Sequence, residues 1–226
     1  MEHYAVALAR LQASGRCYPC RCSRATLAAA QIADPASEPV YPGTCRSDPE
    51  AGHGSHAVRY AIDGRESLVE FEDAFQGPYR QDCRRECGDF IVKRRDGCIA
   101  YHLAVVVDDA RQGVTEVARG ADLLSSTPRQ ILLQRSLGLP TPRYGHLPVL
   151  AEPDGQKLAK SRRALPLAAE SAPSQLWQAL SWLEQSPPQE LARAPVRETW
   201  AWAIPNWKPE RLAGIRERRL PPAASS

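Results

Sequence analysis

Residues 101–161 constrain the fold of this chain more than any other segment does. The valine-rich run at residues 101–109 predicts a buried strand, and residues 114–119 predict a second strand beside it. Residues 126–128 (Ser-Thr-Pro) provide a cap followed by proline in the first turn, which predicts a helix that ends at Gly138. Strand, strand and helix in this order predict an α/β fold.

Charged side chains in the same segment suggest two kinds of binding. Lys157 and Lys160 lie three residues apart on a loop that begins with Gly155 and ends at Ser161. Flexible positive charge of this kind suits a polyphosphate. Arg119, at the end of its predicted strand, can hold a carboxylate through two parallel hydrogen bonds. Together these groups indicate an enzyme that joins an acid to a nucleotide.

Length and composition allow one α/β domain with a small appendage in 226 residues. The net charge of +3 permits a nucleic-acid partner without requiring one. The sequence has no apolar run of membrane-spanning length, and its first residues do not resemble a signal peptide, so we expect a cytoplasmic protein with no membrane partner. Seven cysteines, several of them close together, suit metal binding in a reducing compartment.

The rest of the chain predicts a mixture of helices and strands. Residues 2–14 predict a helix that Gly15 ends. Further strands are predicted near residues 57–62, 68–71 and 89–93, a turn at 95–97 leads into the strand at 98–107, and two helices are predicted near 174–183 and 189–203.

The cysteines near the N-terminus have the spacing of a tetrahedral zinc site. Closely paired thiolates plus one distant cysteine are a common way to build such a site. On this chemistry alone the ligands would be Cys17, Cys20, Cys22 and Cys45. A closed site of four ligands is structural and performs no chemistry.

Three short motifs follow one another in the order seen in a known family. They are Arg119-Gly-Ala-Asp-Leu, Pro142-Arg-Tyr144-Gly-His146 and Lys157-Leu-Ala-Lys160-Ser161. This order resembles the class I glutamyl- and glutaminyl-type aminoacyl-tRNA synthetases, in which the last motif is the KMSKS loop. The resemblance implies an incomplete Rossmann-type catalytic domain over residues 1–164 and a small C-terminal helical region over residues 165–226. It also implies a zinc-binding insertion at about residues 17–46 and a KMSKS-like loop at residues 157–161.

Within that family the chain resembles the glutamyl-Q tRNA(Asp) synthetases. Only the residues after Ser161 remain for a C-terminal region, too few for the large anticodon-binding region of the glutamyl-tRNA synthetases. The cysteine pattern agrees, because these proteins carry Cys-x-Cys and then Tyr-x-x-x-Cys with the tyrosine oxygen as a ligand. The resemblance therefore implies that one structural Zn²⁺ is bound by Cys20, Cys22, Tyr41 and Cys45.

The resemblance also implies a reaction and its partners. The glutamate carboxylate would attack the α-phosphate of ATP, which Mg²⁺ accompanies, releasing pyrophosphate and leaving glutamyl adenylate. The activated glutamate would then pass to queuosine in the anticodon of tRNA(Asp), releasing AMP. Tyr101 and Arg119 would bind L-glutamate. Lys157 and Lys160 would be the catalytic lysines, and they would bind ATP together with Ser161. We expect a monomer.

One departure from the family bears on activity. The family begins with a strand, an Arg-Phe-Ala-Pro-Ser type segment and a HIGH-like motif, and the 226 residues contain none of these. We therefore expect this chain to bind ATP poorly and to catalyse weakly or not at all. The alternatives are a non-catalytic, zinc-stabilised RNA-binding remnant and a truncated glutamyl-tRNA synthetase.

Overall fold

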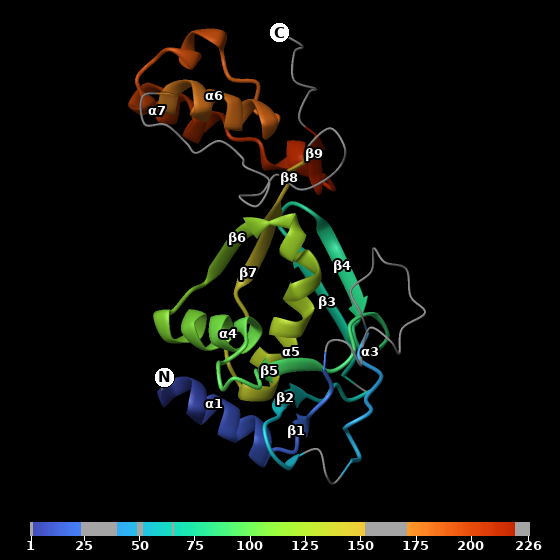
Figure 1. The fold of residues 1–226 in the computed structure, drawn as a ribbon. Helices are drawn as coiled ribbons and strands as arrows, with labels where there is room; N and C mark the ends of the chain where they lie inside the picture. The colour runs from blue at the N-terminus through green and yellow to red at the C-terminus, as the bar shows by residue number, and fades with distance from the viewer. Residues whose placement is uncertain (1, 24–39, 49–51, 65, 152–170, 220–226) are drawn as a thin grey trace, which may run out of the picture. The chain divides into compact units, whose positions relative to one another are not determined.

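The computed structural model describes residues 2–23, 40–48, 52–64, 66–151 and 171–219 (Figure 1). Its α-helices are α1 (Glu2–Ala13), α3 (Cys83–Glu86), α4 (Tyr101–Gln112), α5 (Thr127–Leu137), α6 (Ala172–Trp182) and α7 (Val196–Asn206). Its strands are β1 (Cys17–Cys20), β2 (Ala57–Tyr60), β3 (Leu68–Asp73), β4 (Gly77–Asp82), β5 (Phe90–Lys93), β6 (Glu116–Gly120), β7 (Arg143–Leu147), β8 (Val149–Ala151) and β9 (Glu217–Arg219).

The chain divides into two compact units, which we describe separately. Unit one comprises Met1–Phe71, Tyr79–Val117 and Ser125–Arg143. Unit two comprises Glu72–Pro78, Ala118–Leu124 and Tyr144–Ser226. The predicted boundary between residues 164 and 165 lies outside the described residues and stays a prediction.

Unit one contains a small antiparallel sheet and three packed helices. The sheet has the strand order β1-β2-β5, in which Cys17 pairs with Tyr60 and Cys20 with Ala57. Helices α1, α4 and α5 contact one another (Figure 1). Leu11, Leu103 and Leu133, one from each helix, are fully buried. This packing forms an apolar core beside the sheet.

The predicted N-terminal helix is confirmed as α1. Ala7, Leu8 and Leu11 are its buried residues, and their spacing places them on one side of the helix. Gly15 then adopts the left-handed conformation with φ of 69°. The amide of Arg16 donates to the carbonyl of Leu11 at 2.9 Å, so the turn satisfies a carbonyl that the end of a helix leaves open.

The strand predicted at residues 98–107 and 101–109 is wrong, because residues 101–112 form the helix α4. Three consecutive valines favoured a strand. The buried residues of α4 are Leu103, Val106 and Val107, which follow the i, i+3, i+4 spacing of a helix. Gly113, with φ of 68°, ends the helix. Burial against α1 and α5 overrides the strand preference of valine.

The other predicted strands before residue 120 and the predicted helix after them are confirmed, but the predicted pairing of one strand is not. Residues 57–60, 68–73, 90–93 and 116–120 are strands, and α5 ends before Gly138, whose φ is 63°. The second sheet has the strand order β4-β3-β7-β6, so β6 lies beside β7 rather than beside the segment predicted as its partner. Asp73 of β3 pairs in parallel with Tyr144 of β7.

Unit two contains the predicted C-terminal helices. Helices α6 and α7 contact each other, and Leu180, Ala203 and Leu212 are its buried apolar residues in this region. Helix α7 begins at Val196, later than predicted, because residues 189–192 form a short 3₁₀ helix and Pro195 precedes α7. Strands β8 and β9 pair in parallel. Among the described helices, none has both the length and the apolarity needed to span a membrane.

Candidate functional site

The structure brings Cys20, Cys22 and Cys45 together in unit one. Cys20 ends β1, Cys22 follows two residues later, and Cys45 lies in a turn farther along the chain. Their Sγ atoms all lie within 4.8 Å of one another. Tyr41 points its hydroxyl at the same cluster, 3.5 Å from Sγ of Cys20 and 3.7 Å from Sγ of Cys22.

The distances between these sulfur and oxygen atoms match those between the ligand atoms of a tetrahedral zinc site. With Zn–S near 2.3 Å and Zn–O near 2.0 Å, tetrahedral geometry places two sulfurs about 3.8 Å apart and a sulfur about 3.5 Å from an oxygen. The Sγ atoms of Cys22 and Cys45 are 3.4 Å apart, and the Tyr41 hydroxyl distances are 3.5 and 3.7 Å. Three soft thiols and a phenol oxygen thus surround a space that suits Zn²⁺.

Cys17 is not a member of this cluster, although chemistry alone made it a candidate ligand. It lies at the opposite end of β1 from Cys20, where it pairs with Tyr60. Burial raises the pKa of the Cys17 thiol to about 12. The fourth group beside the three described cysteines is Tyr41.

A buried arginine lies against the cluster. The guanidinium of Arg59 lies 3.7 Å from the centre of the Tyr41 ring, and its Nε donates to Sγ of Cys20 at 3.2 Å. Burial alone would raise the pKa of Cys45, but hydrogen bonds from the Tyr41 hydroxyl and the Arg21 backbone lower it to about 7. Cys45 therefore becomes a thiolate more readily than an ordinary cysteine does.

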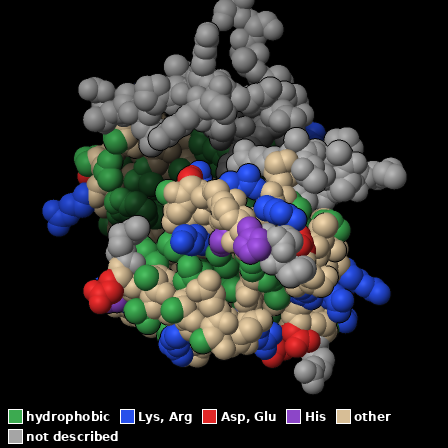
Figure 2. Space-filling view, turned by 60° about the horizontal axis from the view of Figure 1, so that its bottom comes forward, with side chains coloured by type: hydrophobic (Ala, Val, Ile, Leu, Met, Phe, Trp, Pro, Cys, Tyr) green, Lys and Arg blue, Asp and Glu red, His purple; other side chains and the backbone are tan. Residues whose placement is uncertain are grey.

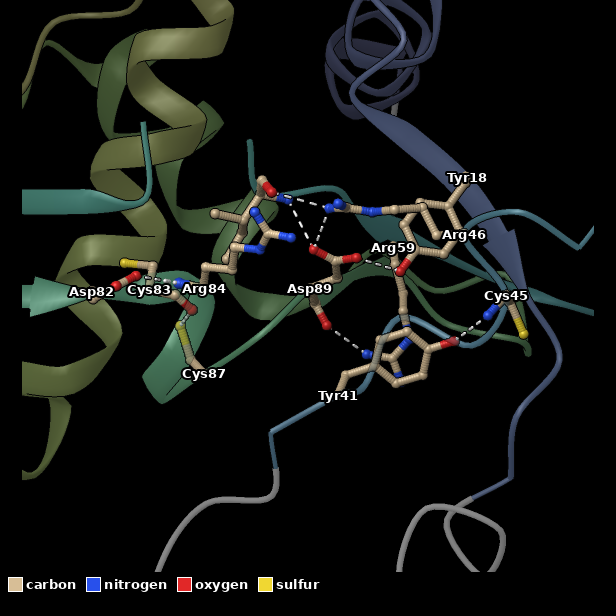
Figure 3. A network of polar contacts seen from close by, with 11 residues as sticks. Tyr18, Tyr41, Cys45, Arg46, Arg59, Asp82, Cys83, Arg84, Cys87 and Asp89 are labelled. Carbon is tan, nitrogen blue, oxygen red and sulfur yellow. Dashed lines mark hydrogen bonds and ion pairs between the residues drawn. The ribbon is translucent and has the colours of Figure 1, made fainter. Parts of the chain in front are cut away.

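Asp89 connects this cluster to the sheet (Figure 3). Its carboxylate accepts hydrogen bonds from the Tyr18 hydroxyl at 2.6 Å, from Arg46 at 2.7 Å and from the amide of Ile62 at 2.8 Å. Its backbone carbonyl accepts a bond from Arg59 at 2.7 Å. One residue thus fixes both the arginine against the cluster and the strands beside it.

Unit two places Arg119 in a second polar chain. Nε of Arg119 donates to Nε2 of His146 at 3.0 Å, and Nδ1 of His146 lies 2.5 Å from Oδ2 of Asp73. The Arg119 guanidinium also lies 5.4 Å from the centre of the Tyr144 ring. Arg119 is thereby held by a buried imidazole and an aromatic face.

The remaining predicted residues are placed as follows. Tyr101 is the first residue of α4 in unit one and is 51% exposed, whereas Arg119 belongs to unit two. Lys157, Lys160 and Ser161 lie outside the described residues, so their roles stay predictions.

Sequence reasoning missed Asp73, Arg59 and Asp89. Each acts through partners between 27 and 73 residues away in the chain. No local sequence pattern predicts contacts between residues so far apart in the chain. His146 stood in one of the three ordered motifs, but no role had been given to it.

The face seen in Figure 2 has a mixed surface. Lys and Arg side chains form several separate groups there instead of one continuous patch, and Asp and Glu side chains lie between and beside them. This distribution agrees with a net charge of only +3. Charge on this face does not by itself mark a nucleic-acid interface.

Comparison with known proteins shows the family. A model described as "tRNA synthetases class I (E and Q), catalytic domain" matches residues 1–178. Among curated proteins, "Glutamyl-Q tRNA(Asp) synthetase" of Aromatoleum aromaticum is 48% identical over 92% of this chain and 64% of its own length. The protein of the same name from Synechococcus is 48% identical over 94% of this chain and 71% of its own length. The chain thus spans about two thirds of the length of these relatives.

Solved structures agree on the fold. A glutamate tRNA ligase from Elizabethkingia meningosepticum superposes with a TM-score of 0.58 at 20% identity, covering 74% of this chain and 37% of that one. A glutamate-tRNA synthetase from Elizabethkingia anophelis gives a TM-score of 0.57 at 21% identity, covering 73% of this chain and 37% of that one. At such low identity the likeness speaks only for the fold, and it confirms the predicted class I α/β catalytic domain.

Proposed function

The chain belongs to the class I tRNA synthetases of the glutamate and glutamine group, and we propose that it activates glutamate with ATP and transfers it to queuosine in tRNA(Asp). One observation carries this proposal: curated relatives named for that tRNA resemble the chain over more than nine tenths of its residues. The whole reaction is a proposal for this chain, because it spans only part of those relatives.

The first step needs alignment and charge stabilisation instead of a covalent nucleophile. Arg119 would bind a carboxylate of glutamate through its guanidinium, and Tyr101 would donate a hydrogen bond from its phenol. Lys157 and Lys160 would neutralise the charge that develops on pyrophosphate, and Ser161 would contact ATP. Mg²⁺ would arrive with ATP instead of occupying a protein cage.

A structural Zn²⁺ fits the cluster of Cys20, Cys22, Tyr41 and Cys45. Support comes from the donor set and from spacings that match a tetrahedral site. The ion would tie the end of β1 to the turn that carries Cys45. Four protein ligands leave no open position, so this zinc would stabilise the insertion and take no part in the reaction.

The partners of the chain would then be ATP, L-glutamate and tRNA(Asp) that carries queuosine. A tRNA substrate and a cluster of reduced cysteines both suit the cytoplasm. We propose that the chain acts there as a monomer.

Glutamate-dependent exchange of pyrophosphate into ATP, measured without tRNA, tests the activation step. We expect exchange that is weak, that requires L-glutamate and that falls further in Lys160→Met, while Lys208→Met, far along the chain, serves as the matched control. Exchange that appears only when tRNA is added would favour the truncated glutamyl-tRNA synthetase instead. No exchange under either condition would favour a non-catalytic, RNA-binding role.

A further inference from the structure

Arg119 is hydrogen-bonded to a buried imidazole, which is in turn hydrogen-bonded to a buried carboxylate. Arg119 Nε donates to His146 Nε2 at 3.0 Å, and His146 Nδ1 lies 2.5 Å from Asp73 Oδ2. The side chains of His146 and Asp73 are both 0% exposed. All three residues belong to unit two. Carboxylate, imidazole and guanidinium therefore form one hydrogen-bonded chain, whose first two members are buried and whose Arg119 end is half-buried.

This chain permits only one form of His146. An arginine Nε always carries a hydrogen, so Nε2 of His146 must offer a lone pair to Arg119. The hydrogen of the neutral ring must then lie on Nδ1, where it is donated to Asp73. A doubly protonated His146 would direct an N–H group at the N–H of Arg119. The geometry thus requires a neutral imidazole in the Nδ1–H form.

Asp73 divides its two oxygens between two tasks. Oδ1 accepts hydrogen bonds from the amides of Phe75 at 3.0 Å, Gln76 at 2.9 Å and His146 at 3.0 Å. Oδ2 receives the imidazole of His146. One oxygen therefore holds the turn after β3, and the other holds the tautomer of the ring.

Close backbone packing makes this contact possible. A Cβ atom placed on Gly145 would lie 2.8 Å from Cε2 of Phe75 and 3.4 Å from Cβ of Ala74. The amide of Ala74 also donates to the carbonyl of Tyr144 at 2.9 Å. Only a residue without a side chain at position 145 lets β7 approach the turn closely enough for His146 to reach Asp73.

We propose that Asp73 and His146 are positioning residues that fix the orientation of Arg119 for binding the carboxylate of glutamate. The bond to His146 uses the Nε edge of the guanidinium, so it sets the direction of the two Nη groups, which form the fork that suits a carboxylate. This inference rests on the proposed role of Arg119 in glutamate binding. Neither residue touches the substrate, and both act through Arg119.

The substitution Asp73→Asn separates this role from folding. The asparagine Oδ1 can still accept the three backbone amides, so the turn is retained. Its Nδ2 is a donor, which forces the hydrogen of His146 from Nδ1 to Nε2, facing the N–H of Arg119. We expect L-glutamate to bind about 10- to 100-fold more weakly, as is usual when a supporting residue is lost.

Two further variants make the test specific. His146→Gln can still offer an oxygen to Arg119, so it should bind L-glutamate more tightly than Asp73→Asn does. Asp96→Asn makes the same chemical change at an exposed turn, where the aspartate accepts the amide of Cys98 at 3.1 Å, and it should bind like the wild type. Arg119→Lys removes the fork itself and should abolish measurable binding.

The measurements are calorimetric titration of the 226-residue chain with L-glutamate, and long-range ¹H–¹⁵N spectra that report the tautomer of His146. We expect the Nδ1–H form in the wild type and the Nε2–H form in Asp73→Asn. The inference alone is overturned if Arg119→Lys loses binding while Asp73→Asn binds normally, or if wild-type His146 carries its hydrogen on Nε2. If the wild type binds no glutamate, or Arg119→Lys binds as well as the wild type, the proposed role of Arg119 fails first, and the positioning role fails with it.

Discussion

Replacing Asp89 with alanine should destabilise unit one by about 3 kcal/mol. The substitution removes a carboxylate that accepts the Tyr18 hydroxyl at 2.6 Å, Arg46 at 2.7 Å and the Ile62 amide at 2.8 Å. Ile62 is 1% exposed, so its amide would be left without a partner, at a cost of about 1–3 kcal/mol. The Arg46 side chain is 38% exposed and can regain water, which keeps its share smaller, near 1 kcal/mol.

Urea unfolding of the zinc-loaded chain, followed by circular dichroism, measures this loss. At a slope of about 2 kcal/mol per molar urea, 3 kcal/mol lowers the midpoint by about 1.5 M. All five tryptophans lie between residues 177 and 207, so tryptophan fluorescence reports unit two and should change little.

Two further substitutions serve as controls for the Asp89→Ala measurement. Asp89→Asn retains the shape and one accepting oxygen, so it should cost less than Asp89→Ala. Asp96→Ala removes a carboxylate that is 48% exposed and should leave the urea midpoint nearly unchanged. A loss below about 1 kcal/mol in Asp89→Ala would refute the view that this buried carboxylate holds the sheet and the cysteine cluster together.

Three other predictions test separate parts of the structure. The purified chain should contain one zinc ion, which the Cys45→Ser variant should lose and the Cys17→Ser variant should keep. Elemental analysis after gel filtration measures the zinc content. Zinc retained in Cys45→Ser would contradict the ligand set. Burial and Arg119 lower the pKa of His146 below its ordinary 6.5, although Asp73 opposes the shift. The neutral His146 therefore stabilises the fold at pH values above 6.5, and this stabilisation is lost as the pH falls. The stability advantage of the wild type over His146→Gln should shrink from pH 8 to pH 5. An advantage that grows over this range would contradict the prediction. Gly145→Ala should cost about 1–3 kcal/mol because its methyl group would meet Phe75 at 2.8 Å, whereas Gly52→Ala, with its nearest contact at 3.5 Å, should cost less; equal urea midpoints would contradict the steric argument.

Local signals in the sequence predicted the helices with clear ends and most of the strands. Gly15 and Gly138 end α1 and α5 in the left-handed conformation, as expected for glycine after a helix. The segment 101–107 failed because three valines outweighed the helical spacing of Leu103, Val106 and Val107. Gly113, twelve residues after the start of α4, was the available signal for a helix end.

Part of each candidate site could likewise be predicted from local sequence, and part could not. Cys20, Cys22 and Cys45 could be predicted as a cluster, since two closely spaced cysteines with one distant cysteine are a common pattern of zinc ligands. Chemistry alone favoured Cys17, and only the family resemblance pointed to Tyr41, because the choice depends on which end of β1 faces the turn with Cys45. The support of Arg119 by Asp73 was not predictable from local sequence, because Asp73 and His146 are 73 residues apart and meet only where β3 pairs with β7.

Transfer of labelled glutamate to tRNA tests the central claim most directly. The 226-residue chain is incubated with ATP, Mg²⁺ and labelled L-glutamate, with tRNA(Asp) that carries queuosine, tRNA(Asp) that lacks it, or tRNA(Glu). The account predicts weak labelling, confined to the queuosine-bearing tRNA(Asp). Label at the 3′ end of tRNA(Glu), or no label on any of the three, would contradict it.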